Sequence, residues 1–366
     1  MAVSPKGLTA IHIGRRIPSR SSSWTIPAAF GIIHPSPNPD TSFQMKNIIL
    51  DCDPGYDDAV ALLLAAGSPE IRLLAVTTVA GNQTLAKVTG NARRILQAAG
   101  VRDVPVAAGA ARPLVRGEVV VCPEIHGESG LDGTTLPEPD LPVDPRHAAQ
   151  LIIDIVMREP EGTVTLVPTG PLTNIALAAR MEPRIVSRVK EVVLMGGGYH
   201  IGNVRPFAEF NIENDPEAAH IVFSESWKVV MVGLDLTYQA RADEAVRGRA
   251  RGIDTFPGRL FSDVLEAFAI NYKKRSGFTA PPVHDPCAVA YVIDPTVVET
   301  VPVPISIEMT GTLTRGMTVA DFRRPAPEGC HTHAAVKLDQ ERFWAMVFDA
   351  VERLGDPDPG VVLPKD

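Results

Sequence analysis

The sequence predicts an α/β fold of the Rossmann-like kind, with an open, mostly parallel sheet flanked by helices. Three observations predict it: short aliphatic runs alternate with helical periodicity from residue 46 onward, glycine-rich or polar turns follow the aliphatic runs, and 45% of the 366 residues are hydrophobic. Repeated strand–helix units give a parallel sheet covered on both faces. The C-terminal part departs from this pattern, and we expect a small β-hairpin and a closing helix there.

The expected strands cover 46–50, 72–79, 163–168, 191–195 and 228–234. Each is a short, aliphatic run, as is typical of buried parallel strands. Apolar residues at helical spacing predict helices over 59–66, 84–99, 172–181 and 216–224, with Asp215 as the N-cap of the last. Residues 303–309 and 315–319 flank a threonine- and glycine-rich turn and predict the hairpin. The apolar stripe from Phe343 to Leu354 predicts the closing helix.

The composition changes at about residue 44. Residues 1–44 hold six prolines, several serines and four basic residues but a single acid, a composition that does not form a core. We expect a disordered N-terminal extension; the alternatives are a targeting segment or an upstream start codon, with Met45 the functional first residue. Residues 45–358 are expected to form one domain and 359–366 a C-terminal tail.

Charge and cysteine usage exclude several classes of partner. The net charge is −8 and no basic block follows the N-terminal segment, so neither nucleic acid nor an anionic membrane is expected as a partner. No apolar run approaches the roughly 18 residues that span a bilayer. The four cysteines are far apart and form no CxxC pair, which indicates a reducing, cytoplasmic compartment.

Four aspartates crowd the turn between the first expected strand and the first expected helix: Asp51, Asp53, Asp57 and Asp58. Like charges this close repel one another and require compensation. Pro54 and Gly55 make the bend, and the helix start that follows offers free backbone N–H groups and a positive dipole end. A hard cation is the expected further partner, because oxygen-only clusters of aspartates suit Ca²⁺ or Mg²⁺.

Three later strand ends carry further small or oxygen-bearing residues: Asn82, Thr169-Gly170, and Gly196 to Gly198. Ligands of open parallel sheets bind beyond the carboxyl ends of the strands, so a site is expected there. Each residue also has a structural interpretation. Asn82 is typical of turns, Thr169 of helix caps, and three glycines of a flexible loop.

The connection from Tyr199 to Asn214 combines amides and carboxylates with two phenylalanines. Glu209 and Asn211 are two residues apart, so in an extended segment their side chains point the same way. Such groups suit the hydroxyls of a sugar, each of which donates and accepts a hydrogen bond. A solvated loop is the structural alternative.

Two histidines are ambiguous. His284 precedes Asp285-Pro286, in which Asp285 suits a helix N-cap and Pro286 the first helical position. A lone histidine beside such a cap is more often a surface residue than a catalyst. His126 is interpreted as structural or peripheral.

Known Asp-rich motifs give two comparisons. An EF-hand loop is excluded, because counting from Asp51 places Tyr56 and Leu62 where that loop needs Gly and Glu. A haloacid-dehalogenase-like Mg²⁺ phosphohydrolase also begins with Asp-x-Asp after its first strand, but it leaves Asp57-Asp58 unexplained. It is the weaker alternative, and a non-catalytic protein that binds ribose or a nucleoside is another.

Six motifs, in this order, resemble those of the inosine–uridine-preferring nucleoside hydrolases: 51–59 (DCDPGYDDA), 77–82 (TTVAGN), 167–174 (VPTGPLTN), 193–198 (VLMGGG), 208–211 (AEFN) and 283–286 (VHDP). The likeness extends from about Lys46 to Asp358. Departures are small: Pro171 stands where some relatives have glycine, and Asn214 where others have an apolar residue.

The resemblance implies Ca²⁺-dependent hydrolysis of the N-glycosidic bond of purine and pyrimidine ribonucleosides, such as inosine and uridine, to ribose and free base. It places His284 facing the leaving base. As the mechanism we expect direct attack by a water that the ion holds, with Asp53 accepting the proton and His284, whose unperturbed pKa is about 6.5, protonating the base. The resemblance gives as calcium ligands Asp53, Asp58, the Thr169 carbonyl and Asp285. Around the substrate it places Asp57, Asn82, Met195, Asn203, Glu209, Asn211 and Asp285.

Two further properties follow from the resemblance. It suggests a homodimer or homotetramer. We also expect the segment from Tyr272 to Phe278 to form a flap over the base. The base preference is not fixed by these motifs.

Overall fold

The computed structural model describes residues 45–356, so the predictions for 1–44 and 359–366 lie outside the described residues. The main sheet contains β1 (Lys46–Cys52), β2 (Ile71–Thr78), β3 (Val106–Ala108), β4 (Val143–Asp144), β5 (Val164–Pro168), β6 (Val189–Met195), β7 (Val229–Val232), β8 (Val298–Pro302) and β11 (Thr332–Leu338). β9 (Ile305–Ile307) and β10 (Thr318–Ala320) pair separately.

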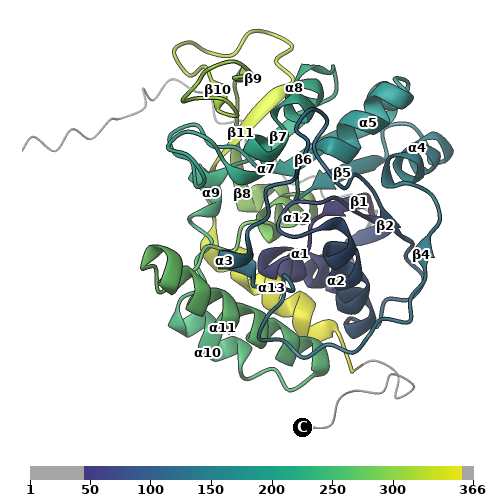
Figure 1. The fold of residues 1–366 in the computed structure, drawn as a ribbon, viewed down its shortest axis with the longest axis vertical. Coiled ribbons are helices and arrows are strands. Elements are labelled where there is room, and N and C mark those ends of the chain that lie inside the picture. The colour runs from purple at the N-terminus through teal and green to yellow at the C-terminus, as the bar shows by residue number, and fades with distance from the viewer. Residues whose placement is uncertain (1–44, 357–366) are drawn as a thin grey trace, which may run out of the picture. The chain divides into compact units, whose positions relative to one another are not determined.

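The helices between the strands include all those that the sequence predicts (Figure 1). They are α1 (Tyr56–Gly67), α2 (Leu85–Ala98), α3 (Pro123–His126), α4 (Ala148–Arg158), α5 (Thr173–Met181), α6 (Ile185–Arg188), α7 (Phe210–Asn214), α8 (Pro216–Ser224), α9 (Leu234–Thr237), α10 (Glu244–Ala250), α11 (Phe256–Ser276), α12 (Pro286–Ile293) and α13 (Gln340–Arg353). Within residues 45–356, none combines the length and the apolar character needed to cross a membrane.

The strand order is β4-β3-β2-β1-β5-β6-β7-β11-β8. Every neighbouring pair is parallel except β11 and β8, which confirms the predicted α/β fold. The predicted hairpin is the antiparallel pair β9 and β10. The sequence did not predict β3, β4, β8 or β11, because β3 and β4 are very short and β8 and β11 mix charged or polar residues with their apolar ones.

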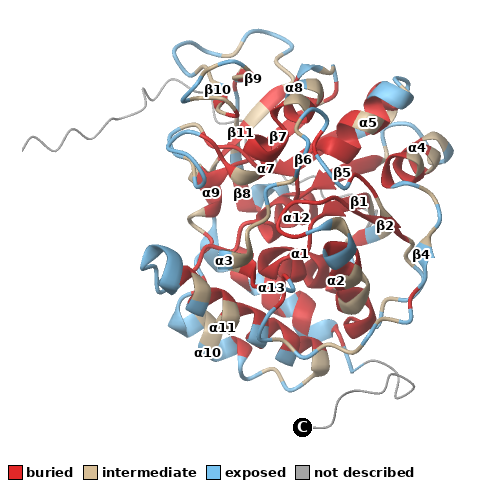
Figure 2. Ribbon diagram, viewed as in Figure 1, coloured by how far each residue is buried: buried red, intermediate tan, exposed pale blue. Residues whose placement is uncertain are grey.

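The two faces of the sheet bury two separate hydrophobic clusters, as alternation along the strands requires. In β1, Ile48 and Leu50 pack toward α1, α11, α12 and α13, whereas Ile49 packs toward α4, α5 and α8. α1 is apolar on all sides because it is enclosed by other helices as well as by the sheet, and it is buried along almost its whole length (Figure 2).

The order of the strands in the sheet changes direction at β1. After β1 the chain continues through β2, β3 and β4 on one side, and it then returns to the other side of β1 as β5. The loops after β1 and β5 therefore lead away in opposite directions, which leaves room for a ligand beyond their carboxyl ends. Asp53 follows β1 and Thr169 follows β5, so the fold places both at this point.

Candidate functional site

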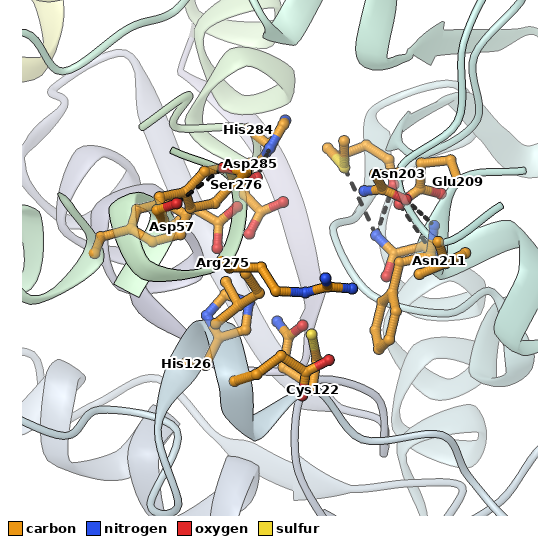
Figure 3. Close-up of a pocket in the computed structure, with 18 of the residues that line it drawn as sticks. Asp57, Cys122, His126, Asn203, Glu209, Asn211, Arg275, Ser276, His284 and Asp285 are labelled. Atoms are coloured by element: carbon orange, nitrogen blue, oxygen red, sulfur yellow. Dashed lines mark hydrogen bonds between the residues drawn. The ribbon is translucent and has the colours of Figure 1, made fainter. Parts of the chain in front are cut away.

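A pocket of about 240 Å³ opens beyond the carboxyl ends of the central strands (Figure 3). It is lined by most of the residues that the sequence singles out: Asp57, Asn82, Thr169, Met195, Asn203, Glu209, Asn211, His284 and Asp285. Asp53 and Asp58 are fully buried and hydrogen-bond to Asn82 and Thr169 on the pocket wall. The fold thus gathers at one place residues that are far apart in the sequence.

The aspartate turn is held by Asp58, the third residue of α1. Its carboxylate accepts hydrogen bonds from the backbone N–H groups of Asp53, at 3.3 Å, and Gly55, at 3.1 Å. Asp58 thus caps the start of its own helix, where N–H groups lack partners. Residue 55 must be glycine, because a Cβ there would lie 2.3 Å from Nδ1 of His126.

Asn82 joins the second strand end to this turn, so it is more than a turn residue. Its backbone N–H donates to Asp53 Oδ2 at 2.6 Å, and its Nδ2 donates to the Asp53 carbonyl and to Asp58 Oδ2, both at 3.2 Å. Thr169 joins the third strand end, because its hydroxyl donates to Asp58 Oδ1 at 2.9 Å. Two carboxylates are therefore fixed from three strand ends.

Asp57, Asp58 and Asp285 form a cluster that could hold a metal ion. One carboxylate oxygen of each lies within 4.8 Å of the others, and all three residues are buried. Burial, and after it repulsion from Asp58, raises the pKa of Asp57 to about 8. The same causes, burial and neighbouring carboxylates, raise the pKa of Asp53 and of Asp285 well above the ordinary range.

The residues present fit a cation. Asp53 Oδ1 and Asp57 Oδ1 are buried without a hydrogen-bond partner. Asp285 occupies the N-cap position of α12 as predicted, but its side chain makes no capping hydrogen bond, so capping does not explain the carboxylate. Crowded, buried carboxylates with free oxygens are stabilised by a positive ion, and oxygen ligands suit Ca²⁺ or Mg²⁺.

Asp51 lies behind the cluster. Its Oδ1 accepts hydrogen bonds from the Thr77 hydroxyl at 2.6 Å and from Asn174 Nδ2 at 2.8 Å, and burial raises its pKa to about 6. Asn174 also donates to the Thr78 carbonyl and accepts from the Ala110 N–H. Asp51 thus fixes the end of β1 from behind.

Glu209 and Asn211 line the opposite wall, but their predicted extended conformation is wrong. Glu209 is the N-cap of α7, and its carboxylate accepts hydrogen bonds from the N–H groups of Asn211, Ile212 and Gly197. Burial raises its pKa to about 7. Asn211 lies in α7 and donates from Nδ2 to the carbonyls of Thr169, at 2.7 Å, and Met195, at 3.2 Å.

His284 faces the Asp57 side of the pocket. Its Nδ1 lies 2.7 Å from the Thr237 hydroxyl and its Nε2 lies 3.2 Å from the Tyr272 hydroxyl. Burial lowers its pKa to about 4, so the unperturbed value expected from sequence does not hold. The interpretation of His284 as a surface residue is also wrong, because it is only 6% exposed.

Several pocket residues were not predicted. His126 lines the pocket, and its Nδ1 accepts a hydrogen bond from the Tyr56 N–H at 3.2 Å. Cys122, Tyr238 and Phe268 also line it, and so does Arg275, which falls within the segment 272–278 that was expected to cover the base. The expected flap is in part regular helix, since Tyr272 to Ser276 form the end of α11. Nothing in the spacing of these residues indicated the pocket; only the placement of α3 and α11 does.

Comparison with known proteins identifies the family. The family model described as inosine-uridine preferring nucleoside hydrolase matches residues 48–345. The chain belongs to this family. An inosine-uridine preferring nucleoside hydrolase of Crithidia fasciculata is 61% identical over 313 residues, which cover 85% of this chain and 99% of that protein. Nucleoside hydrolases cleave N-glycosidic bonds.

Other nucleoside hydrolases are similar but carry different names. A pyrimidine-specific ribonucleoside hydrolase, RihA, of Photobacterium profundum is 46% identical over 299 residues, which cover 81% of this chain and 96% of that protein. The solved structure of a purine-preferring ribonucleoside hydrolase from Gardnerella vaginalis superposes with a TM-score of 0.80 at 33% identity. It covers 84% of this chain and 99% of the other. Relatives with similar sequences or folds are therefore named for different base preferences.

Proposed function

We propose that this nucleoside hydrolase uses Ca²⁺ to hydrolyse purine and pyrimidine ribonucleosides, inosine and uridine among them, to ribose and free base. The observation that carries the proposal is the buried cluster of Asp57, Asp58 and Asp285, which borders a pocket with amides on one side and His284 on the other. The 61% identity to a protein named for inosine and uridine supports this substrate pair.

The proposed calcium ligands are Asp53, Asp58, the Thr169 carbonyl and Asp285. The free Oδ1 of Asp53 and the burial of all three carboxylates support this set. When bound, the ion supplies a positive charge that holds a water and lowers its pKa. Ca²⁺ is proposed over Mg²⁺ because the ligand set includes a backbone carbonyl and suits a larger, flexible coordination sphere.

We propose that Asp53 accepts the proton of the attacking water. Cleavage of the C–N bond builds positive charge on the ribose ring, as in other glycoside hydrolyses. The surrounding carboxylates stabilise this charge because they are already in place. Water attacks directly, with inversion at the anomeric carbon; a trapped glycosyl-enzyme would contradict this step.

The hydrogen bonds already present support the proposed roles of the amides. Both Nδ2 hydrogens of Asn82 and of Asn211 are directed at protein oxygens, so the Oδ1 atoms are left to accept ribose hydroxyls. Asp57 Oδ1 is likewise free to accept a hydroxyl. Asn203, Glu209, Met195 and Asp285 complete the proposed sugar site.

His284 is the proposed acid for the leaving base. Burial lowers its pKa to about 4, so the ring is neutral before the reaction. We propose that it takes up one proton from solvent when the substrate is bound, donates that proton from a ring N–H to the base as the C–N bond breaks, and returns to neutral imidazole. Tyr272 and Thr237 hold the ring between them. Its orientation toward the base does not then depend on its charge.

One assay tests the proposed activity. Purified protein is incubated with inosine or uridine, with Ca²⁺ and after EDTA treatment, and the free base and ribose are measured. Base release that requires Ca²⁺ supports the proposal. Binding without release indicates the non-catalytic alternative, and phosphate release from a phosphomonoester under Mg²⁺ indicates the phosphohydrolase alternative, against which the family match argues.

The single-domain organisation, the cytoplasmic location and the homo-oligomer stay predictions. The four free cysteines, two of them buried, support a reducing compartment. Light scattering on the purified chain measures the oligomeric state, with a dimer or tetramer expected.

A further inference from the structure

Two loops border the mouth of the pocket from different parts of the chain. The loop of residues 111–122 follows β3 and ends at Cys122, which lines the pocket directly before α3 and His126. The loop of residues 199–208 follows β6 and carries Asn203, another lining residue. Neither loop contains a helix or a strand, so contacts from side chains elsewhere in the chain contribute to holding them in place.

Glu213 on α7 contacts both loops. Arg116 of the first loop donates from Nη1 and Nη2 to the two carboxylate oxygens of Glu213, at 3.1 and 2.8 Å. Arg205 of the second loop donates from Nε to Oε1 of the same carboxylate, at 3.0 Å. The Glu213 side chain is only 8% exposed. Burial alone would raise its pKa, but the two guanidinium groups hold that pKa below its ordinary value.

The next two residues anchor the first loop at further points. Asn214 pairs with the backbone of Val120, through Val120 N–H to Oδ1 at 3.3 Å and Nδ2 to the carbonyl at 2.9 Å. Asp215 Oδ2 accepts from the Leu114 N–H at 2.9 Å. Asn214, the departure that the sequence shows, therefore has a structural role in binding this loop.

In the second loop, backbone hydrogen bonds link the position of Asn203 to that of Arg205. The Gly202 N–H donates to the Pro206 carbonyl at 3.0 Å and the Asn203 N–H to the Ala208 carbonyl at 3.2 Å, which close a tight turn around Arg205. Asn203 Oδ1 accepts from the Phe210 N–H at 2.9 Å. Because Arg205 lies within this turn, its bond to Glu213 restrains the position of Asn203.

We propose that Arg116, Glu213 and Arg205 form a clamp that holds the two loops together and positions Asn203 at the sugar. None of the three lines the pocket, so they are positioning residues. The proposal rests on the proposed function, because its kinetic test uses nucleoside hydrolysis. It predicts that the clamp governs substrate binding and leaves the bond-breaking groups unchanged.

The kinetic test uses Glu213→Gln, Arg205→Ala and Arg116→Ala with inosine as substrate. Each is expected to raise KM about five- to tenfold and to change kcat less than about twofold, because a misplaced amide weakens binding of sugar in ground and transition states alike. The control is Arg315→Ala, which breaks the half-buried ion pair to Glu217 on α8 outside the pocket, and leaves KM unchanged.

Lysine substitutions sharpen the test. Arg205 uses one nitrogen, so Arg205→Lys is expected to retain a KM within about twofold of wild type. Arg116 uses two nitrogens in a fork that lysine cannot reproduce, so Arg116→Lys is expected to behave like Arg116→Ala. Unchanged KM in Glu213→Gln, or a fall in kcat alone, overturns the clamp.

Hydrogen exchange provides a readout that needs no activity. In Glu213→Gln and Arg205→Ala, the amides of Ala208 and Phe210 are expected to exchange faster than in wild type, while Arg315→Ala leaves them unchanged. If wild-type protein fails to hydrolyse any nucleoside, the proposed function is wrong and exchange alone decides the clamp. Unaltered exchange in both variants overturns it.

Discussion

Asp53→Asn tests two properties that we propose for the buried carboxylates: affinity for calcium, and a loss of stability when calcium is absent. Asp53 is fully buried; its Oδ2 accepts the Asn82 N–H at 2.6 Å and its Oδ1 has no partner. An asparagine keeps the first contact through its own oxygen. It removes one charge from a group of carboxylates that repel one another.

The expected change in Tm caused by Asp53→Asn, relative to wild type, has opposite signs with and without calcium. Removing one buried charge from a group of carboxylates that repel one another is expected to stabilise the calcium-free protein by about 2 kcal/mol, which raises Tm by about 4 °C. Free Ca²⁺ at 100 times Kd stabilises the wild type by about 2.7 kcal/mol, or about 5 °C. The variant is expected to show no calcium-dependent shift and to lose about 10³-fold in kcat.

The assay combines thermal unfolding, with and without EDTA, and calcium titration calorimetry. Asp51→Asn is the matched control, because Asp51 lies two residues away at the end of β1 and also has one bonded and one unpartnered oxygen. It is expected to keep the calcium-dependent shift in Tm. Wild-type calcium affinity together with full turnover in Asp53→Asn would refute the reasoning.

Three further predictions concern other parts of the site. His284→Ala is expected to reduce hydrolysis of inosine far more than that of p-nitrophenyl riboside, whose leaving group needs no proton; equal losses would remove the acid role. Asn174→Ala removes three buried hydrogen bonds, to Asp51, Thr78 and Ala110, and leaves the Ala110 N–H without a partner; it is expected to cost about 3 kcal/mol in urea unfolding, and a cost below about 1 kcal/mol would contradict this. The two arginines of the clamp lower the pKa of Glu213 in the folded protein. The stabilisation that the ionised Glu213 carboxylate provides is therefore complete above pH 4.5, its ordinary pKa, and is lost as the pH falls through its lower pKa in the folded protein. The difference in unfolding free energy between wild type and Glu213→Gln is therefore expected to be constant from pH 7 to about 5 and to shrink below that; a difference that grows in acid would show that the sign is wrong.

The sequence predicted the fold, and it predicted that the candidate site residues gather at one edge of the sheet, because both depend on local patterns. Alternating aliphatic and helical segments predict a parallel sheet, and a parallel sheet brings its strand ends to one edge. Asp53, Asn82 and Thr169 therefore had to lie near one another. The predicted start of the helix over 216–224 is also correct, because Asp215 accepts a hydrogen bond from the Ala218 N–H as an N-cap does.

The errors occurred where distant segments meet. Glu209 and Asn211 do not form an extended pair, because Glu209 caps α7 and starts a helix that a five-residue stretch scarcely signals. His126 was interpreted as peripheral, since nothing near it in sequence shows that α3 packs beside the aspartate turn. Arg116 and Glu213 are 97 positions apart, and no local pattern pairs them.

The sequence by itself thus determined the family, the sheet and the crowding of acids after its first strand, since these follow from neighbouring residues and ordered motifs. Only the tertiary structure decided which of those acids have free oxygens, that His284 is neutral near pH 7, and that one buried glutamate joins both loops at the pocket mouth. The physical reason is that hydrogen-bond partners and exclusion of water are set by segments remote in the chain. A carboxylate that the sequence shows only as a charge becomes a helix cap, an ion-pair partner or a candidate metal ligand according to what the fold packs against it.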